Sequence, residues 1–428
     1  MRIAYIASGA GNMYCGSCLH DNALAAALIK LGHEVALIPT YTPIRTDEES
    51  VSMDHVFYGG INVYLQQKSS LFRHTPSAVD ELLNSRGLLK WISRYTSSTD
   101  ARELGPLTIS VLQGEEGNQR KELHKLIEWL KDSYKPELIH LTNAMFVGFA
   151  RDMKKALNVP VLCSLQGEDI FLEDLVEPHK SRALQVLRER ARDVDGFIAT
   201  SHYYADFMKN YLDVPSSKID TVRLGLNLKG YGEETKTLPA DPFVIGYLAR
   251  ICPEKGLHVL VDAFDLLMKK GVPARLRVAG YLGKRDENYL HGLLKKIADQ
   301  GWKDRFEYIG EINRADKIQF LNTLHVLSVP TVYREPKGLY ILEALANGVP
   351  VVQPSHGSFP ELIEATKGGI LVDPESPQSL ADGLHSLFKD PGLREELGRN
   401  GKEAVHRSFG DRDMAEATLQ VYNRYVRR

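Results

Sequence analysis

Two glutamates eight residues apart, Glu335 and Glu343, are the residues best suited to bind a small polar ligand. A helix is expected at 339–346, because Asn347-Gly348 directly after it would end it. Glu335 precedes this helix and Glu343 lies within it. Carboxylates accept two hydroxyl hydrogen bonds at once, as the diols of ribose and hexose require. The free N–H groups at the helix start would face a diphosphate. The pattern therefore predicts a nucleotide-sugar site; the alternative is two surface glutamates.

The residues at the start of this helix extend the expected donor site. Gly338 and Leu339 begin the helix, so their backbone N–H groups would meet a bound diphosphate. Lys337 adds a cation, which would favour a donor that carries a phosphate or a carboxylate. The alternative for Lys337 is a side chain that points into solvent.

A basic pair follows the first expected strand of the second half of the chain. Arg250 and Lys255 come after the apolar run 243–248, in a turn that contains Pro253 and Gly256. Ligands of open α/β sheets bind at the carboxyl ends of the strands. Arginine offers a planar fork and lysine a mobile charge, and both suit phosphate oxygens. We expect the pair to neutralise a diphosphate; the alternative is two solvated charges.

A glycine-rich loop follows the first strand, which is expected at residues 2–8. Gly9, Gly11 and Gly16 precede a helix expected at 18–31, and glycine lets the backbone approach a phosphate closely. The spacing departs from the full dinucleotide-binding fingerprint. The loop is therefore either a donor-binding loop or a plain turn.

Cys15 and Cys18 form a C-x-x-C pair in the same loop. At a helix start such a pair can support thiol redox chemistry or supply half of a zinc site. The nearest further ligands, His20 and His33, are poorly spaced, so we expect no metal site. Four cysteines in 428 residues make no disulfide framework.

Short β-branched runs alternate with helical stretches along the chain, which predicts parallel βαβ units with helices on both faces of each sheet. The segment 228–241 contains Gly and Pro without apolar periodicity and reads as a linker. We expect an α/β protein with domains at 1–230 and 240–405 and a C-terminal helix within 406–428. Strands are expected at 2–8, 34–39, 138–141, 159–165, 196–201, 243–248, 274–279, 306–309, 326–329 and 349–352.

An insertion at 45–125 is unusually long for a connection between a strand and a helix, and long insertions tend to be functional. It contains β-like runs at Val56–Tyr58 and Ile61–Leu65 and a helical stretch at Val79–Thr96. We expect the insertion to line the acceptor side. Its aromatic and basic residues include Tyr58, Tyr64, Phe72, Trp91, Lys68 and Arg73.

Charge and hydropathy argue against several classes of protein. The formal net charge is −2 and the basic residues are scattered, so we expect no nucleic-acid partner. The first apolar run is too short for a secretory signal, and no stretch reaches the roughly 20 apolar residues of a membrane span. We therefore expect a cytoplasmic protein, with peripheral membrane contact left open.

The segment around Glu335 and Glu343 resembles the E-x7-E motif of retaining GT-B glycosyltransferases, in particular glycosyltransferase family 4 (glycosyl transferases group 1). The resemblance covers nearly the whole chain and is strongest over 243–375. It implies a GT-B fold, with two Rossmann-like, doubly wound parallel-sheet domains that face each other across a cleft. Further matching positions are Gly338, Glu343-Ala344, Ala346, Gly348, Pro350-Val-Val352, Gly357-Ser-Phe-Pro-Glu361 and Gly368-Gly-Ile-Leu-Val372.

This resemblance implies a role for each residue of the site. Glu335 would bind donor-sugar hydroxyls and Glu343 the ribose, while Arg250 and Lys255 would neutralise the leaving diphosphate. The implied reaction is a retaining, metal-independent hexosyl transfer from a nucleotide-diphosphate sugar to a hydroxyl, with no further cofactor. The acceptor could be a small molecule, a saccharide or a lipid-linked group. The C-terminal helix would cross back to the first domain.

One departure concerns Gln166, which stands where the family usually has a histidine that contacts the donor sugar. Donor preference therefore does not carry over. Glu168 and Asp169 could orient an acceptor hydroxyl, although Asp169 could equally cap the following helix. His140 and Asn143 are further acceptor candidates, but a lone histidine in such a place is more often structural.

Other functions remain open at this level. A glycoside phosphorylase or a sugar-nucleotide epimerase could use the same two-domain fold. A thiol redox protein would depend on Cys15 and Cys18. A nicotinamide-dependent oxidoreductase is disfavoured, because the first loop lacks the full fingerprint and no convincing acidic residue stands at the ribose position.

Overall fold

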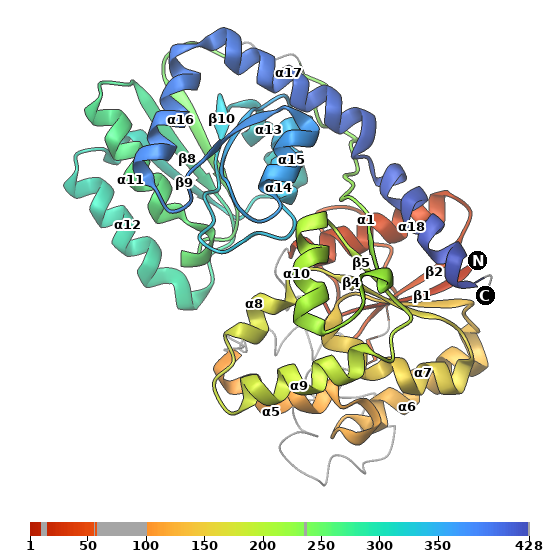
Figure 1. Ribbon diagram of the computed structural model, residues 1–428. Helices are drawn as coiled ribbons and strands as arrows, with labels where there is room; N and C mark the ends of the chain where they lie inside the picture. The colour runs from red at the N-terminus through yellow and green to blue at the C-terminus, as the bar shows by residue number, and fades with distance from the viewer. Residues whose placement is uncertain (10–14, 55, 58–100, 235–237, 427–428) are drawn as a thin grey trace. The chain divides into compact units, whose positions relative to one another are not determined.

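The computed structural model describes residues 1–9, 15–54, 56–57, 101–234 and 238–426 (Figure 1). It consists of two compact units: Met1–Gly225 with Asp411–Arg428, called unit 1, and Leu226–Gly410, called unit 2. Each unit is built on a six-stranded sheet in which neighbouring strands are parallel. The expected α/β architecture with two parallel sheets is confirmed.

The sheet of unit 1 has the strand order β2-β1-β3-β4-β5-β6. Its strands are β1 (Arg2–Ala7), β2 (Glu34–Pro39), β3 (Leu138–Leu141), β4 (Val161–Leu165), β5 (Gly196–Ala199) and β6 (Ile219–Thr221). Its helices include α1 (Gly16–Lys30), α5 (Ala101–Leu112), α6 (Arg120–Trp129), α7 (Ala150–Leu157), α8 (Glu168–Glu173), α9 (His179–Ala191) and α10 (His202–Leu212). The order reverses between β1 and β3, so ligands are expected at the carboxyl ends of these strands.

Strand β1 shows why this sheet needs helices on both faces. Successive strand residues point to opposite faces. Ile3 and Tyr5 belong to one apolar core, whereas Ala4 and Ile6 belong to another. All four side chains are completely buried. A continuous apolar run, rather than an alternating one, is what a strand covered on both faces requires.

The sheet of unit 2 has the order β12-β11-β10-β7-β8-β9. Its strands are β7 (Phe243–Leu248), β8 (Ala274–Ala279), β9 (Phe306–Gly310), β10 (Val326–Leu327), β11 (Val351–Pro354) and β12 (Gly369–Val372). Its helices are α11 (Leu257–Lys269), α12 (Glu287–Asp299), α13 (Arg314–Asn322), α14 (Leu339–Ala346), α15 (Phe359–Thr366), α16 (Pro377–Lys389) and α17 (Pro391–Ser408). In Figure 1, α11 and α12 flank one face of the sheet and α13 to α15 the other.

The last helix of the chain, α18 (Asp411–Val426), packs against α1 (Figure 1). Met414, Val421 and Tyr422 are buried and share an apolar core with Ile3 and Leu24. The C-terminal helix therefore completes the core of unit 1.

The structure adds two strands that the sequence did not predict, β6 and β12, which lie at sheet edges. Val56 and Phe57, expected in a strand, belong to none. The other runs of the insertion, Ile61–Leu65 and Val79–Thr96, lie outside the described residues, as do Tyr58, Tyr64, Phe72, Trp91, Lys68 and Arg73. Residues 101–125 of the insertion contain α5, a 3-10 turn at Gly114–Glu116 and the start of α6.

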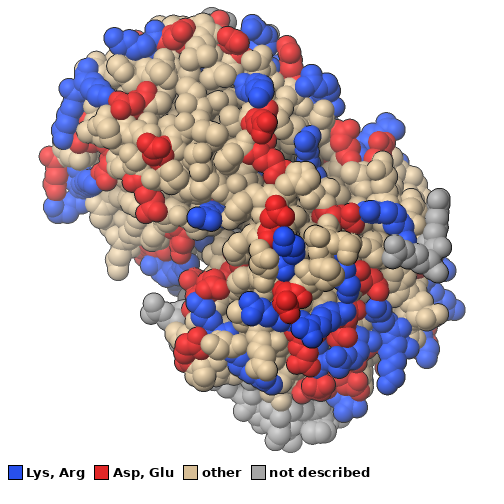
Figure 2. Space-filling model, in the orientation of Figure 1, with Lys and Arg blue, Asp and Glu red and all other residues tan. Residues whose placement is uncertain are grey.

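The surface is mixed in charge on the face that Figure 2 shows, where acidic and basic side chains are interspersed. This agrees with the formal net charge of −2. None of the described helices is long and apolar enough to cross a bilayer.

Candidate functional site

The candidate site of unit 2 lies where the strand order reverses. Strands β7 and β10 are neighbours, paired at Ile245 and Val326. Their carboxyl ends lead into the two loops that carry Arg250 with Lys255, and Glu335. Open α/β sheets bind ligands at such a reversal. The topology therefore brings the basic pair and the first glutamate to the same edge of the sheet.

Gly256 allows these two loops to touch. Its φ of +71° lies in the left-handed region, and a β-carbon on it would come within 1.8 Å of the carbonyl oxygen of Pro330. Any other residue would push the loops apart. The close approach places Lys255, the residue before Gly256, beside the loop that carries Glu335.

Glu335 is buried and held through one oxygen. Its Oε2 accepts hydrogen bonds from Lys255 Nζ at 2.5 Å, from the Tyr333 hydroxyl at 2.6 Å and from the Tyr340 hydroxyl at 3.4 Å. Its backbone carbonyl accepts from the N–H of Ser358 at 2.8 Å. Among the described residues, none hydrogen-bonds to Oε1. The carboxylate is thus fixed while one oxygen is left for a ligand.

Electrostatics keep Glu335 ionised. Burial by itself raises the pKa of a carboxyl group, but the charge and hydrogen bond of Lys255 and the Tyr333 hydroxyl outweigh it. Lys337, which is half-buried, acts in the same direction. The pKa of Glu335 is therefore below its ordinary value, so this residue is an acceptor of hydroxyl hydrogen bonds near neutral pH.

Glu343 is held in a similar way on α14. Its Oε1 accepts from Lys317 Nζ at 2.5 Å and from the Tyr231 hydroxyl at 3.3 Å. No other side-chain contact to this carboxylate occurs in the described part of the chain, so Oε2 has no protein partner there. Both glutamates of the motif therefore present one anchored oxygen and one oxygen without a protein hydrogen bond.

The start of α14 has the properties of an anion site. Gly338 occupies the cap position at φ +78° and offers no side chain to the free N–H groups of the first turn, which begins at Leu339. Arg250 is exposed, and its Nε lies 3.3 Å from the Sγ of Cys252. The uncapped helix end suits a phosphate group.

The glycine loop of unit 1 is described only at its ends. Gly9 has φ +73°, and a β-carbon there would come within 2.1 Å of the carbonyl oxygen of Thr42. Gly16 begins α1. Gly11 lies outside the described residues. Gly9 therefore permits a tight packing of this loop against the segment after β2.

Gln166 and His140 belong to a buried polar network in unit 1. The Nε2 of Gln166 donates to Asp21 Oδ1 and to the carbonyl oxygen of Thr142, both at 2.8 Å. His140 is completely buried and contacts the Tyr422 hydroxyl through Nδ1. Burial lowers the pKa of His140 to about 3, so the ring is neutral near pH 7. The structure thus assigns interior contacts to both residues.

The three remaining acceptor candidates are near one another but bind protein groups. Glu168 is buried and accepts from the N–H groups of Ala144 at 3.0 Å and Gln166 at 2.7 Å. Asn143 accepts from the N–H of Met145. Asp169 accepts from the Tyr204 hydroxyl at 2.6 Å. Burial raises the pKa values of Glu168 and Asp169. These contacts organise the loops after β3 and β4.

Several residues of the unit 2 site were not found by sequence reasoning: Lys317, Tyr231, Tyr333 and Tyr340. Lys317 offered a signal, since it lies on α13 at helical spacing from the buried Phe320 and Leu321. A lysine on an apolar helix face needs a partner. The tyrosines offered none, because tyrosine also fits an ordinary apolar core.

The remaining candidates in unit 1 carry no assigned chemistry. Cys18 is buried, Cys15 is half-buried and neither forms a disulfide. The described residues contain no group of three or more His, Cys, Asp or Glu that could hold a metal ion.

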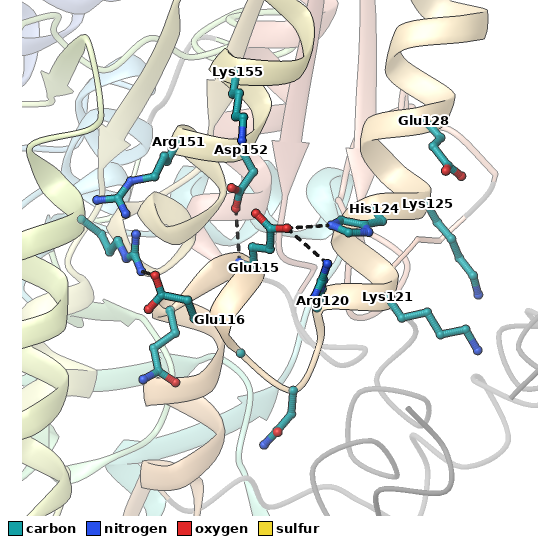
Figure 3. A pocket seen from close by; sticks show the side chains of 14 residues that line it. Glu115, Glu116, Arg120, Lys121, His124, Lys125, Glu128, Arg151, Asp152 and Lys155 are labelled. Carbon is teal, nitrogen blue, oxygen red and sulfur yellow. Dashed lines mark hydrogen bonds and ion pairs between the residues drawn. The ribbon is translucent and has the colours of Figure 1, made fainter. Parts of the chain in front are cut away.

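A pocket of about 1100 Å³ lies among α6, α7 and α9. Figure 3 shows the side chains that line it. Its charged side chains pair with one another: Glu115 with Arg120 at 3.4 Å and His124 at 3.5 Å, and Glu116 with Arg190 at 2.8 Å. Each of these two glutamates is thus held by basic side chains of the same pocket, and neither belongs to the glutamate motif of unit 2.

Comparison with known proteins gives consistent matches in both units. Residues 233–404 match the model of the family "Glycosyl transferases group 1", and residues 22–225 match that of the "Glycosyl transferase 4-like domain". The D-inositol 3-phosphate glycosyltransferase of Paenarthrobacter aurescens is 30% identical over 249 residues, which are 55% of this chain and 59% of the relative. The capsular polysaccharide biosynthesis glycosyltransferase CapM of Staphylococcus aureus is 29% identical over 195 residues, 46% of this chain and 50% of that one. The chain thus spans about half the length of the curated relatives it matches.

Solved structures confirm the GT-B fold. The sucrose-phosphate synthase of Thermosynechococcus elongatus superposes with a TM-score of 0.70 at 19% identity, over 99% of this chain and 98% of that one. Anabaena HepE in complex with UDP superposes with a TM-score of 0.69 at 17% identity, over 99% of this chain and 100% of that one. At this level of identity the likeness concerns the fold. Together with the two family models, it shows that the chain belongs to the group 1, family 4-like glycosyltransferases of GT-B fold.

Proposed function

We propose that this chain is a retaining glycosyltransferase that moves a hexosyl group from a nucleotide-diphosphate sugar to a hydroxyl acceptor, without a metal ion. The observation that carries the proposal is the pair Glu335 and Glu343 in unit 2. Each has one oxygen anchored by a lysine and a second oxygen without a partner among the described residues. Family membership supports the same activity.

In this proposal the donor lies along the start of α14. Glu335 Oε1 accepts hydroxyls of the sugar, and Glu343 Oε2 accepts hydroxyls of the ribose. The uncapped N–H groups of the first turn of α14, which begins at Leu339, bind the diphosphate. Lys255 uses one N–H donor on Tyr333 and one on Glu335, so its third is left for a phosphate oxygen. Arg250 supplies a second cation.

These groups would stabilise the leaving diphosphate as its charge develops. The bond between the anomeric carbon and the diphosphate oxygen breaks, and a bond to the acceptor oxygen forms on the same face of the sugar. The acceptor proton passes to the leaving diphosphate. No protein nucleophile is needed, and the cations and the helix end take the place that a metal ion has in other glycosyltransferases.

UDP is the first nucleotide to test, because HepE, which has the same fold, was solved with UDP. The variant Glu335→Gln should reduce sugar transfer by roughly tenfold to hundredfold through the loss of charged hydrogen bonds, with UDP affinity close to that of the parent. Glu343→Gln should instead weaken UDP binding, by about tenfold. Transfer from UDP-sugars and calorimetric UDP binding measure the two effects.

Glu396→Gln, an exposed glutamate of α17, is the matched control and should behave as the parent. Parental transfer in both site variants would refute the assignment. NMR of the product separates the mechanisms: an inverted anomeric centre contradicts retention, and product formed without acceptor favours a hydrolase or epimerase. Activity that disappears in EDTA would contradict metal independence.

A further inference from the structure

Lys317 is a buried cation that the sequence pattern did not explain. It lies on α13 and is 7% exposed, and its Nζ is 2.5 Å from Glu343 Oε1, a residue that is 6% exposed. A lysine is rarely buried unless it is paired. Removing one member of such a pair leaves an uncompensated charge in the interior. The position of the Glu343 carboxylate is therefore set by α13 as well as by its own helix.

Tyr231 completes this arrangement from a third segment. It is 1% exposed, and its hydroxyl donates to the same Glu343 oxygen at 3.3 Å. The guanidinium of Arg314 lies over its ring, 4.9 Å from the centroid. The next residue, Gly232, donates its N–H to Asn347 Oδ1 at 2.9 Å. Tyr231 is thus fixed by the end of α14 and by the start of α13.

These contacts act on only one oxygen of Glu343. Lys317 and Tyr231 both bind Oε1, so the carboxylate cannot rotate without breaking two hydrogen bonds. A mobile glutamate could turn to whichever hydroxyl a ligand offers. A fixed one presents Oε2 in a single direction, and a ligand without a hydroxyl there leaves the charged oxygen unpaired. Sites of this kind reject analogues that lack the hydroxyl more strongly than mobile sites do.

We propose that Lys317 and Tyr231 are positioning residues that fix Glu343 for the ribose diol, and so give the donor site its preference for ribonucleotides over 2′-deoxyribonucleotides. This inference rests on the proposed function, because it requires that the donor ribose binds at Glu343. It adds two residues, from segments outside the glutamate motif, that determine which sugar of the nucleotide is accepted.

The test is calorimetric binding of UDP and 2′-deoxy-UDP, repeated with the ADP and GDP pairs, to the full-length protein. The parent should bind the preferred ribonucleotide at least about tenfold more tightly than its deoxy form, since a charged hydrogen bond is lost. Lys317→Met should weaken binding of the ribonucleotide by about tenfold and should weaken binding of the deoxynucleotide much less. The ratio of the dissociation constants of the deoxynucleotide and the ribonucleotide should therefore approach one in this variant. Lys317→Arg should restore the parental ratio.

Lys270→Met is the matched control, because Lys270 forms an ion pair with Asp382 on the surface of the same unit. It should keep the parental ratio. If Lys317→Met does not fold, Tyr231→Phe decides the question, since it removes a single hydroxyl and should lower the ratio severalfold. A parental ratio in Tyr231→Phe and in any folded Lys317→Met would overturn the inference. If the parent binds none of the nucleotides, the proposed function itself fails.

Discussion

At the scale of single residues, each glutamate of the site is held by a lysine that comes from a different loop or helix. Glu335 and Glu343 stand at a recognisable spacing before and within a predicted helix. Lys255 is 80 residues from Glu335, and Tyr231 is 112 residues from Glu343. Such contacts are set by tertiary packing, which leaves no periodic signal in the sequence. This explains why Lys255 was expected to meet only phosphate, whereas the structure also pairs it with Glu335.

The buried ring of His140 should make the free energy of unfolding depend on pH. Its pKa is about 3 in the folded protein, against an ordinary value of 6.5. The unfolded chain therefore takes up a proton that the folded chain excludes, so stability should fall as the pH drops from 6.5 toward 3. Between pH 7 and 5 the loss from this residue should be about 2 kcal/mol. Urea unfolding at pH 7, 6 and 5 measures it.

His140→Asn should lose this part of the pH dependence, whatever its stability at pH 7. His202→Asn, at an exposed histidine of α10, is the comparison variant. Equal slopes of stability against pH in the parent and in His140→Asn would show that the buried ring is not the source.

At the scale of elements, prediction worked where burial is complete. Strand β3, whose four residues are all buried, and helix α14, in which seven of eight residues are buried, have the bounds that the sequence predicts, 138–141 and 339–346. Strands β6 and β12 were missed. β6 has three half-buried residues, and β12 begins with a glycine and is mostly half-buried. Edge strands of this kind lack the continuous apolar run that identifies the central ones.

The start of α14 provides a prediction at this scale. Gly338 has φ +78°, and a β-carbon on it would come within 2.9 Å of Leu362 Cδ1. Gly338→Ala should lower the free energy of unfolding by about 1–2 kcal/mol, the cost of a left-handed alanine. It should also weaken UDP binding, because the helix start must shift to relieve the contact. Urea unfolding and calorimetric binding measure the two effects.

Gly301→Ala is the control that separates the effect of backbone strain from the effect of a position at the start of α14. Gly301 has φ +84°, but a β-carbon there meets no atom within 4 Å, and the residue lies beyond the end of α12. It should show a similar loss of stability with parental UDP affinity. If both alanine variants bind UDP as the parent does, the geometry of the α14 start does not control the donor site.

At the scale of the whole molecule, unit 1 is built from two separate stretches of the sequence: α18 follows unit 2 along the chain but belongs to unit 1. Tyr422 of α18 is buried, and its hydroxyl contacts His140 on β3. The anchored glutamates lie entirely in unit 2. Stability of unit 1 and nucleotide binding by unit 2 should therefore be separable.

Tyr422→Phe tests this separation. Losing the hydroxyl leaves a buried ring nitrogen of His140 without its partner, which should cost unit 1 about 1–3 kcal/mol. UDP at a hundred times its dissociation constant should stabilise the unit that binds it by about 2.7 kcal/mol. Scanning calorimetry of the variant should show that unit 1 unfolds at a lower temperature than in the parent. UDP should raise the unfolding temperature of unit 2 as much as it does in the parent. A single transition moved by both changes would mean that the two units unfold as one.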